Sequence, residues 1–191
     1  MTFAKTWKSL ILALLSAGVG ACRVDAPTAP RLTDQAAPGV VQDLTGTLLE
    51  KNALTRRTPL ARDITESATI GRAGGVLAIP AAGFELRIPP GAVSGKTRFT
   101  VTAIRGSLVA YEFGPHGLKF PVPLVARQDL AVTTYSAAIG TLSAGYFLNR
   151  GDLDDANAKA LVAEVISGHT LPLAKRFSWP IDHFSGYIVA W

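Results

Sequence analysis

Hydrophobic and polar residues alternate along the second half of the chain. The stretch 84–88, Phe-Glu-Leu-Arg-Ile, places every second residue on an apolar face, as in a strand with one buried side. The stretch 97–104, Thr-Arg-Phe-Thr-Val-Thr-Ala-Ile, repeats this pattern with β-branched threonines on its polar face. The Pro-Pro-Gly run at 89–91 ends the first strand, because proline cannot donate to a ladder. The same pattern predicts further strands at 107–113, 124–132, 146–148, 171–179 and 181–191.

Turn-forming residues separate these strands closely. The 191 residues include 18 glycines and 12 prolines, and aliphatic residues are plentiful. Short strands with frequent turns favour an all-β sandwich over a helical bundle. A chain of this length suits one domain of average size with a tail. We therefore expect a single β-sandwich domain over residues 64–191.

Three Gly/Pro motifs follow one another between residues 70 and 124. They are a Gly-Gly-x-Leu segment, an Ile-Pro-x-Gly-Ala turn and a Gly-Pro-x-Gly-x-x-Phe-x-x-Pro run, formed by Gly74, Gly75, Leu77, Ile88, Pro89, Gly91, Ala92, Gly114, Pro115, Gly117, Phe120 and Pro123. In this order they resemble the ZU-five domain, which is named for zona occludens proteins and Unc-five netrin receptors. The resemblance covers residues 70–130 and implies a ZU-five-like β-sandwich. Because bacterial envelope proteins carry similar domains, it implies a fold more than a function.

The N-terminus is typical of a bacterial lipoprotein signal. Lys5 and Lys8 precede an apolar stretch, residues 10–19, that is too short to span a bilayer of about 30 Å. Small residues follow, and then Cys22, the only cysteine of the chain. A lone cysteine forms no internal disulfide, whereas acyl chains on it would hold a domain at a membrane with about 0.8 kcal/mol per buried CH₂. We expect a signal peptide over residues 1–21 and a lipid on Cys22, with an ordinary secretory signal as the alternative.

Residues 22–63 have the composition of a tether. Prolines among alanine, threonine and aspartate favour an extended, poorly packing chain. One island, residues 40–54, has leucines at helical spacing and predicts a short amphipathic helix that packs on the domain. Its polar face lacks the basic residues that an anionic-lipid binder would carry. Arg56, Arg57 and Arg62 then form a basic cluster that we interpret as a solvated linker.

The end of the chain carries the main candidate for chemistry, Asp182-His183-Phe184-Ser185-Gly186-Tyr187. His-Phe-Ser at the end of such a domain resembles the self-cleavage site of the ZU-five protein PIDD. The resemblance implies that Ser185 attacks the carbonyl carbon of Phe184 in an N-to-O acyl shift, and that water hydrolyses the ester. The residues suit these roles, because imidazole of His183 could take the serine proton. Gly186 would permit a backbone kink that strains the scissile bond.

An ordinary terminal strand explains the same residues. Phe184 would then be buried, with His183 and Ser185 facing outward. Two observations argue against a Ser-His-Asp hydrolase, which we favour less than self-cleavage. The chain has no Gly-x-Ser-x-Gly segment, and adjacent Asp182 and His183 point to opposite faces of a strand. We therefore expect no enzyme activity, with self-cleavage as the alternative.

Three further groups of residues are candidates for ligand binding: the aspartates of the stretch 152–155, three aromatic residues and two histidines. The aspartates of the stretch 152–155 could attract Ca²⁺, but a capped helix N-terminus is simpler, with a strand over 160–166 as the alternative. The aromatic rings of Trp179, Tyr187 and Trp191 could stack on sugars if they were exposed together. His116 and His169 lie beside glycines in turns and are expected to face solvent. No phosphate loop, dinucleotide motif or metal-ligand spacing occurs, so no cofactor or metal is expected.

Charge adds little to this interpretation. The net charge of +5 falls to +3 without Lys5 and Lys8, and no basic run has interleaved aromatics. Nucleic-acid binding is therefore not expected. The sequence predicts a lipid-anchored binding or scaffolding module of the bacterial cell envelope, with an envelope protein or a glycan such as peptidoglycan as partner. Arg23 after the cysteine gives no mark of inner-membrane retention, so we expect the outer membrane.

Overall fold

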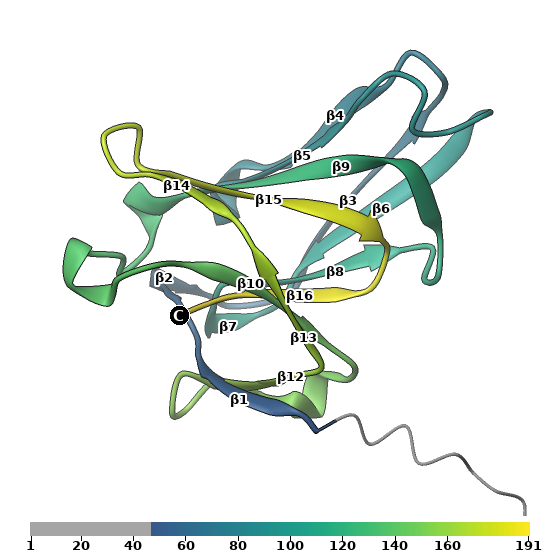
Figure 1. The fold of residues 1–191 in the computed structure, drawn as a ribbon. Helices are drawn as coiled ribbons and strands as arrows, with labels where there is room; N and C mark the ends of the chain where they lie inside the picture. The colour runs from purple at the N-terminus through teal and green to yellow at the C-terminus, as the bar shows by residue number, and fades with distance from the viewer. Residues whose placement is uncertain (1–46) are drawn as a thin grey trace, which may run out of the picture. The chain divides into compact units, whose positions relative to one another are not determined.

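Antiparallel strands form most of the part of the chain that the computed structural model describes, residues 47–191 (Figure 1). The helical turns among these residues are four 3₁₀ segments of three residues each, η1 (Pro80–Ala82), η2 (Leu130–Val132), η3 (Ala137–Ile139) and η4 (Arg150–Asp152). Over residues 47–191, no helix is long and apolar enough to cross a membrane. The all-β prediction is confirmed.

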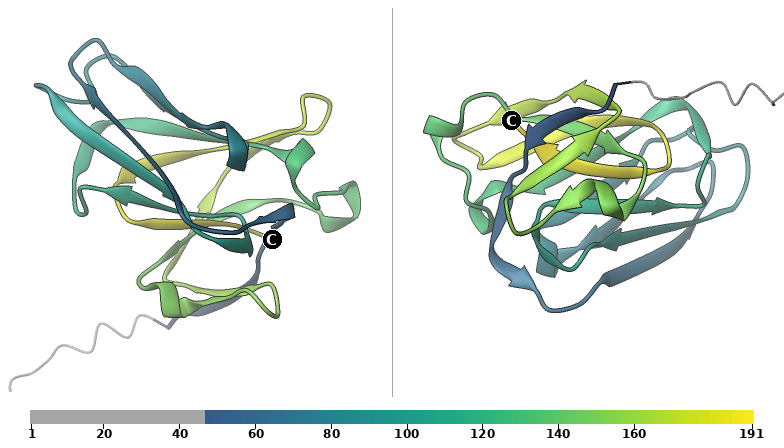
Figure 2. Two further views of the ribbon diagram at one scale, coloured as in Figure 1. Left: turned by 180° about the vertical axis from the view of Figure 1, so that it is seen from behind. Right: turned by 90° about the horizontal axis from the view of Figure 1, so that it is seen from below.

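Two antiparallel sheets face each other as the layers of a sandwich (Figures 1 and 2). The six-stranded sheet has the order β13 (Glu164–Ser167), β10 (Ser143–Phe147), β16 (Gly186–Ala190), β8 (Ala110–Gly114), β6 (Thr97–Ala103) and β3 (Ile64–Ile70). The five-stranded sheet has the order β14 (His169–Leu171), β15 (Arg176–His183), β9 (Lys119–Asp129), β5 (Phe84–Ile88) and β4 (Gly75–Ile79). Two smaller sheets complete the fold: β1 (Leu49–Asn52), β12 (Lys159–Val162) and β11 (Leu153–Asp154) in one, and β2 (Thr55–Leu60) with β7 (Gly106–Leu108) in the other.

The core lies between the two large sheets and is rich in aromatic rings. The predicted inner faces of β5 and β6 are buried, while Glu85 and Arg87 of β5 point outward. The ring of Phe84 stacks on that of Tyr111 with 4.1 Å between the centroids, so the two sheets meet at this pair. Burying one large apolar side chain contributes about 1.5–3 kcal/mol to stability. Because a slip of one residue would expose all the buried side chains of a strand, the total burial energy of the core fixes the register of the strands.

The expected tether and helix are wrong for the residues described. The stretch 49–52 is strand β1, and the following Leu54 has a side chain that is 1% exposed. The backbone N–H of Leu54 donates to the carbonyl oxygen of Val189 at 2.8 Å, and the Leu54 carbonyl accepts from Val109 at 2.9 Å. The domain therefore begins before residue 64, because this segment pairs with strands distant in sequence. The predicted signal peptide, Cys22 and residues 23–46 lie outside the described part.

The basic cluster before the domain is also not a linker. Arg56 is 4% exposed, and its guanidinium donates to the carbonyl oxygens of Ile104, Leu108 and Ala110. Three backbone acceptors thus replace water around this buried cation. Composition alone does not reveal that these acceptors are within reach of Arg56.

The expected helix after Asp152 is wrong, and the alternative of a strand over 160–166 is confirmed in part. Strand β12 covers 159–162 and β13 covers 164–167. Ala160 and Val162 are buried while Leu161 is exposed, which is the period of a strand. The carboxylate of Asp152 accepts from the N–H groups of Leu148 and Asn149, so it closes a short 3₁₀ turn.

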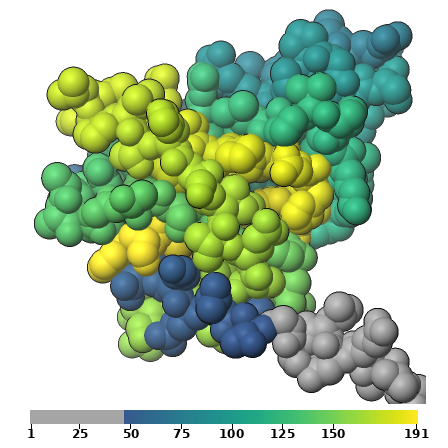
Figure 3. All heavy atoms as spheres, in the orientation of Figure 1, coloured from purple at the N-terminus to yellow at the C-terminus, as the bar shows by residue number. Residues whose placement is uncertain are grey.

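The first and last described segments lie side by side (Figure 3). The N–H of Trp191 donates to the Asn52 carbonyl at 3.0 Å, and Ala53 forms a bridge with Ala190. The strand predicted over 181–191 is divided: β15 runs through Pro180 to His183, and β16 begins at Gly186. Pro180 has no N–H to donate to a neighbouring strand. Among residues 47–191, β15 pairs with β14 as far as Ser178 and beyond it with β9 alone, so no strand on the β14 side lacks a bond from Pro180.

Candidate functional site

The predicted His-Phe-Ser site is a corner where the chain passes from β15 to β16, and so from one sheet to the other. The Phe184 side chain is 1% exposed and packs among Phe99, Phe113 and Phe120, with centroids 4.8–5.5 Å away. Phe184 therefore anchors the corner in the core. The burial expected for an ordinary closing strand is found at this residue.

The described geometry does not bring His183 and Ser185 together as a base and a nucleophile. The imidazole of His183 packs against the rings of Tyr146 and Tyr187, at centroid distances of 5.3 and 5.9 Å. Ser185 is buried rather than outward-facing. No hydrogen bond joins the two side chains within residues 47–191. His183 and Ser185 do not share one face of a strand, because residues 184 and 185 lie outside both β15 and β16.

Backbone hydrogen bonds hold the scissile bond of the predicted cleavage. The N–H of Phe184 donates to the Leu118 carbonyl at 2.9 Å, and the Phe184 carbonyl accepts from Gly117 at 3.1 Å. The Ser185 carbonyl accepts from Phe113 at 2.9 Å. This corner is therefore a well-paired connection, and self-cleavage stays a prediction.

Gly186 serves packing rather than a backbone kink. Its φ is not among the positive values of the described glycines. A Cβ at this position would lie 2.4 Å from the Phe147 ring, closer than real Cβ contacts occur. The glycine thus lets β16 approach an aromatic ring of β10.

The aromatic residues proposed for sugar stacking do not share a surface. Trp179 is 1% exposed and Tyr187 is fully buried, whereas Trp191 is 42% exposed. Trp179 stacks instead on Phe177 in the core, with 5.3 Å between the centroids. The arrangement that would support a glycan-stacking face from these three rings is therefore not found.

The aspartates of the stretch 152–155 serve separate local contacts. Asp154 accepts from Asn157, and Asp155 accepts from the N–H groups of Ser107 and Leu108. In residues 47–191 no group of three or more His, Cys, Asp or Glu residues is placed to hold a metal ion. His116 and His169 are exposed as expected, but only His116 lies in a turn, because His169 is the first residue of β14.

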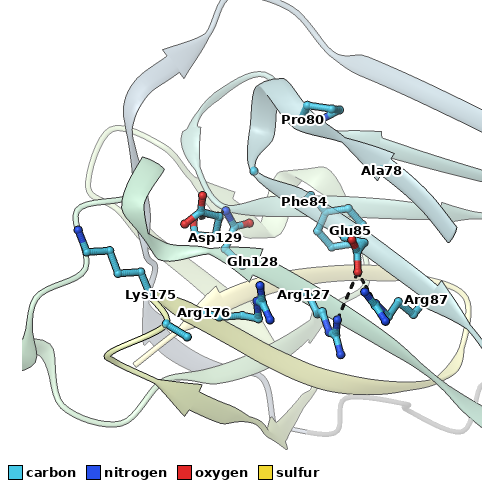
Figure 4. A pocket seen from close by; sticks show the side chains of 12 residues that line it. Ala78, Pro80, Phe84, Glu85, Arg87, Arg127, Gln128, Asp129, Lys175 and Arg176 are labelled. Atoms are coloured by element: carbon cyan, nitrogen blue, oxygen red, sulfur yellow. Dashed lines mark hydrogen bonds and ion pairs between the residues drawn. The ribbon is translucent and has the colours of Figure 1, made fainter.

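A cleft on the outer face of the five-stranded sheet is the best candidate for a binding site (Figure 4). It has a volume of about 380 Å³ and extends across β5, β9 and the beginning of β15. Its lining carries four cationic and two acidic side chains, which leaves a formal surplus of two positive charges: Arg87, Arg127, Lys175, Arg176, Glu85 and Asp129. A positively charged hollow of this kind attracts anions.

Strand register brings these charges together. Glu85 of β5 lies opposite Arg127 of β9, and Asp129 of β9 lies opposite Arg176 of β15. Residues 85 and 87, and likewise 127 and 129, share a face because side chains alternate along a strand. The cleft is therefore built from outward positions of three neighbouring strands, each fixed by the burial of the residues between them.

Glu85 lies at the centre of the arginines. Its carboxylate contacts the guanidinium of Arg87 at 2.5 Å and that of Arg127 at 3.4 Å, as the dashed lines in Figure 4 show. The hydrogen bond from Arg87 is the main cause that lowers the pKa of the Glu85 carboxyl, and the charges of Arg127 and Arg176 act in the same direction against partial burial. Glu85 thus stays ionised at neutral pH and neutralises one of the positive charges.

The remaining cationic groups have spare hydrogen-bonding capacity. The Nε of Arg127 is buried and has no partner among the described residues. Arg176 forms no ion pair there, because the carboxylate of Asp129 accepts instead from the N–H of Ala131 at 2.8 Å. A buried donor without a partner is uncommon, and the accessible parts of the Arg127 and Arg176 side chains remain open to water or to an anion in the cleft.

Sequence reasoning placed Glu85 and Arg87 on the polar face of one strand and Arg127 within the strand predicted over 124–132, and it recognised no site in either. The available signal was an arginine at an outward position of three predicted strands. Only the pairing of β5, β9 and β15 shows that these arginines converge. No protein-family model matches this chain, and no curated protein matches it.

Proposed function

We propose that this protein is a non-enzymatic binding module of the bacterial cell envelope, held at a membrane by a lipid on Cys22. Its binding site is the cleft on β5, β9 and β15, and the group it takes is an anion on an envelope protein or glycan. The supporting observation for the site is the convergence of Arg87, Arg127 and Arg176 on one cleft with a surplus of positive charge.

Guanidinium groups suit this role because their planar donors match carboxylate, phosphate and sulfate oxygens. An anion in the cleft would contact the guanidinium groups of Arg176 and Arg127 without breaking the ion pair between Glu85 and Arg87. The partly buried position of Arg127 strengthens such a contact, because it is less screened than one on an open surface.

The anion site is tested by titrating the purified protein with inorganic phosphate while observing arginine Nε–H signals by NMR. We expect the Arg127 signal to shift and saturate, and Arg127→Gln to abolish saturation of the neighbouring signals. Arg72→Gln is the matched control, because Arg72 is exposed and does not line the cleft. Equal shifts of all arginine signals would show general ionic screening and contradict the proposal.

The lipid anchor is tested separately. The chain expressed with its own N-terminus in a bacterium should partition into the detergent phase of a Triton X-114 extract, whereas Cys22→Ser should remain in the aqueous phase. A Cys22→Ser protein that still enters the detergent phase would contradict lipidation at this residue.

A further inference from the structure

A second hollow lies on the same outer sheet face, next to the cationic cleft. It has a volume of about 410 Å³ and extends across β9, β15 and the beginning of β14. Its outward-facing residues are Pro123, Val125, Ser178, Pro180 and His169, and no Asp, Glu, Lys or Arg lines it. We call it the apolar trough. A cationic cleft and an uncharged trough thus lie side by side.

The strand register gives the spacing between the two. In the ladder of β9 with β15, Val125 pairs with Pro180, Arg127 with Ser178 and Asp129 with Arg176. Val125 and Arg127 lie two residues apart on one strand, so they point to the same face about 7 Å from each other. Along β9 and β15 the outward face changes from apolar to cationic over this single repeat, whereas Arg87 of β5 lies opposite Val125 on the other side of β9.

An extended peptide has the same repeat. Its side chains i and i+2 point to one side and are also about 7 Å apart. A peptide lying along β9 with an acidic side chain at Arg127 would therefore place the side chain two positions away over Val125 and Pro180. Ser178, which lies beside Arg127, could hydrogen-bond the peptide backbone between the two side chains.

We propose that the ligand of this face is an extended segment of a partner protein that carries an acidic residue and, two positions away, a large apolar residue. This inference rests on the proposed function, because it assigns the anion of the cleft to a peptide carboxylate. Charge complementarity selects the acidic residue, since the cleft has a surplus of two positive charges. The uncharged trough selects the apolar one, because burying apolar surface there is favourable.

The experiment measures fluorescence anisotropy of labelled peptides on the purified protein. The test peptides contain Glu-Ser-Leu or Leu-Ser-Glu, one for each direction along β9, within a Gly/Ser frame. The matched control contains Glu-Leu-Ser, which has the same composition but the wrong spacing, and a second control contains Gln-Ser-Leu. We expect one test peptide to bind at least about tenfold more tightly than both controls, as a filled apolar subsite and a paired carboxylate require.

Protein variants separate the two subsites. Val125→Thr should lower the affinity for the test peptide to that for the Glu-Leu-Ser peptide. Phosphate should still saturate the Arg127 signal in this variant. Arg127→Gln should abolish both interactions. Because the peptide comparison uses the unaltered protein, it remains decisive even if a variant folds poorly.

Other outcomes overturn the inference in distinguishable ways. If phosphate binds and the protein binds all four peptides with equal affinity, the peptide ligand is refuted while the anion site is retained. Tighter binding of phosphatidylglycerol vesicles or of an anionic polysaccharide than of any peptide would also refute it. Absence of phosphate binding together with absence of peptide binding would refute the inference and the anion site of the proposed function.

Discussion

The guanidinium of Arg56 lies 5.5 Å from the centre of the Tyr111 ring, inside the domain. A cation in this position gains from the negative face of the ring and from three backbone carbonyls, and it does so without an ion pair among residues 47–191. Because Arg56 belongs to β2 and the carbonyls to residues 104–110, this side chain fastens the first strands to the centre of the sandwich.

Removal of this cation should destabilise the protein. Arg56→Ala leaves buried carbonyl oxygens without a donor and opens a cavity, so we expect the free energy of unfolding to fall by about 3 kcal/mol. Arg57→Ala is the control. Arg57 is exposed and makes one hydrogen bond, to the Ala131 carbonyl at 3.2 Å, and its loss should cost less than about 1 kcal/mol. Urea unfolding followed by tryptophan fluorescence measures both, and similar losses for the two variants would contradict this role of Arg56.

Gly186 should be required by the ring of Phe147. Gly186→Ala places a methyl group against that ring, and we expect a loss of about 1–3 kcal/mol in the free energy of unfolding. Gly151→Ala has open space around its Cβ and should be nearly neutral. In a Phe147→Leu background the cost of Gly186→Ala should shrink, because the clash is relieved. Strict additivity of the two substitutions would show that the ring is not the cause.

Anion binding at the cleft should depend on pH through Glu85. The pKa of this carboxyl is lowered by its arginine neighbours, so the carboxyl becomes neutral only below its ordinary value of about 4.3. Its protonation frees Arg87 and Arg127, so sulfate should bind more tightly as the pH falls through that range.

Glu85→Gln isolates the contribution of Glu85. This variant should bind sulfate more tightly at pH 7 and should lose most of the rise in affinity at low pH. Isothermal titration at several pH values provides the measurement. A pH dependence that is the same in the unaltered protein and the variant would show that Glu85 is not its cause.

The His-Phe-Ser corner should stay intact. Its carbonyls are held by Gly117 and Phe113, and no hydrogen bond in the described structure joins the His183 and Ser185 side chains. Mass spectrometry under denaturing conditions should therefore show one uncut species for both the unaltered protein and Ser185→Ala. A species lacking residues 185–191 in the unaltered protein alone would establish self-cleavage at Ser185 and overturn this expectation.

The local pattern of apolar and polar residues was sufficient to predict a strand and its buried face where every second residue is buried. The inner faces of β5 and β6 could be predicted because every second residue is apolar. The strand β2, Thr-Arg-Arg-Thr-Pro-Leu, has no such pattern, and its buried arginine is satisfied by carbonyls distant in sequence. Nothing local distinguishes that arginine from a solvated one, which explains why the domain boundary was placed too late.

The cleft exposes a second limit of local pattern. Glu85, Arg127 and Arg176 are far apart in the chain, and each alone is an ordinary outward residue. Their convergence depends on the order β15-β9-β5 and on the register of both pairings. A shift of one residue in either ladder would point these side chains to the other face.

The position of β16 has a consequence for how the domain folds during synthesis. The final strand, residues 186–190, is buried along its whole length and lies between β10 and β8 in the six-stranded sheet. A nascent chain lacks this central strand until residues 186–190 have left the ribosome, and until then the segment around Leu54 lacks its pairing with Val189. The six-stranded sheet is therefore expected to close only once residues 186–190 have emerged, rather than strand by strand as the preceding residues are synthesised.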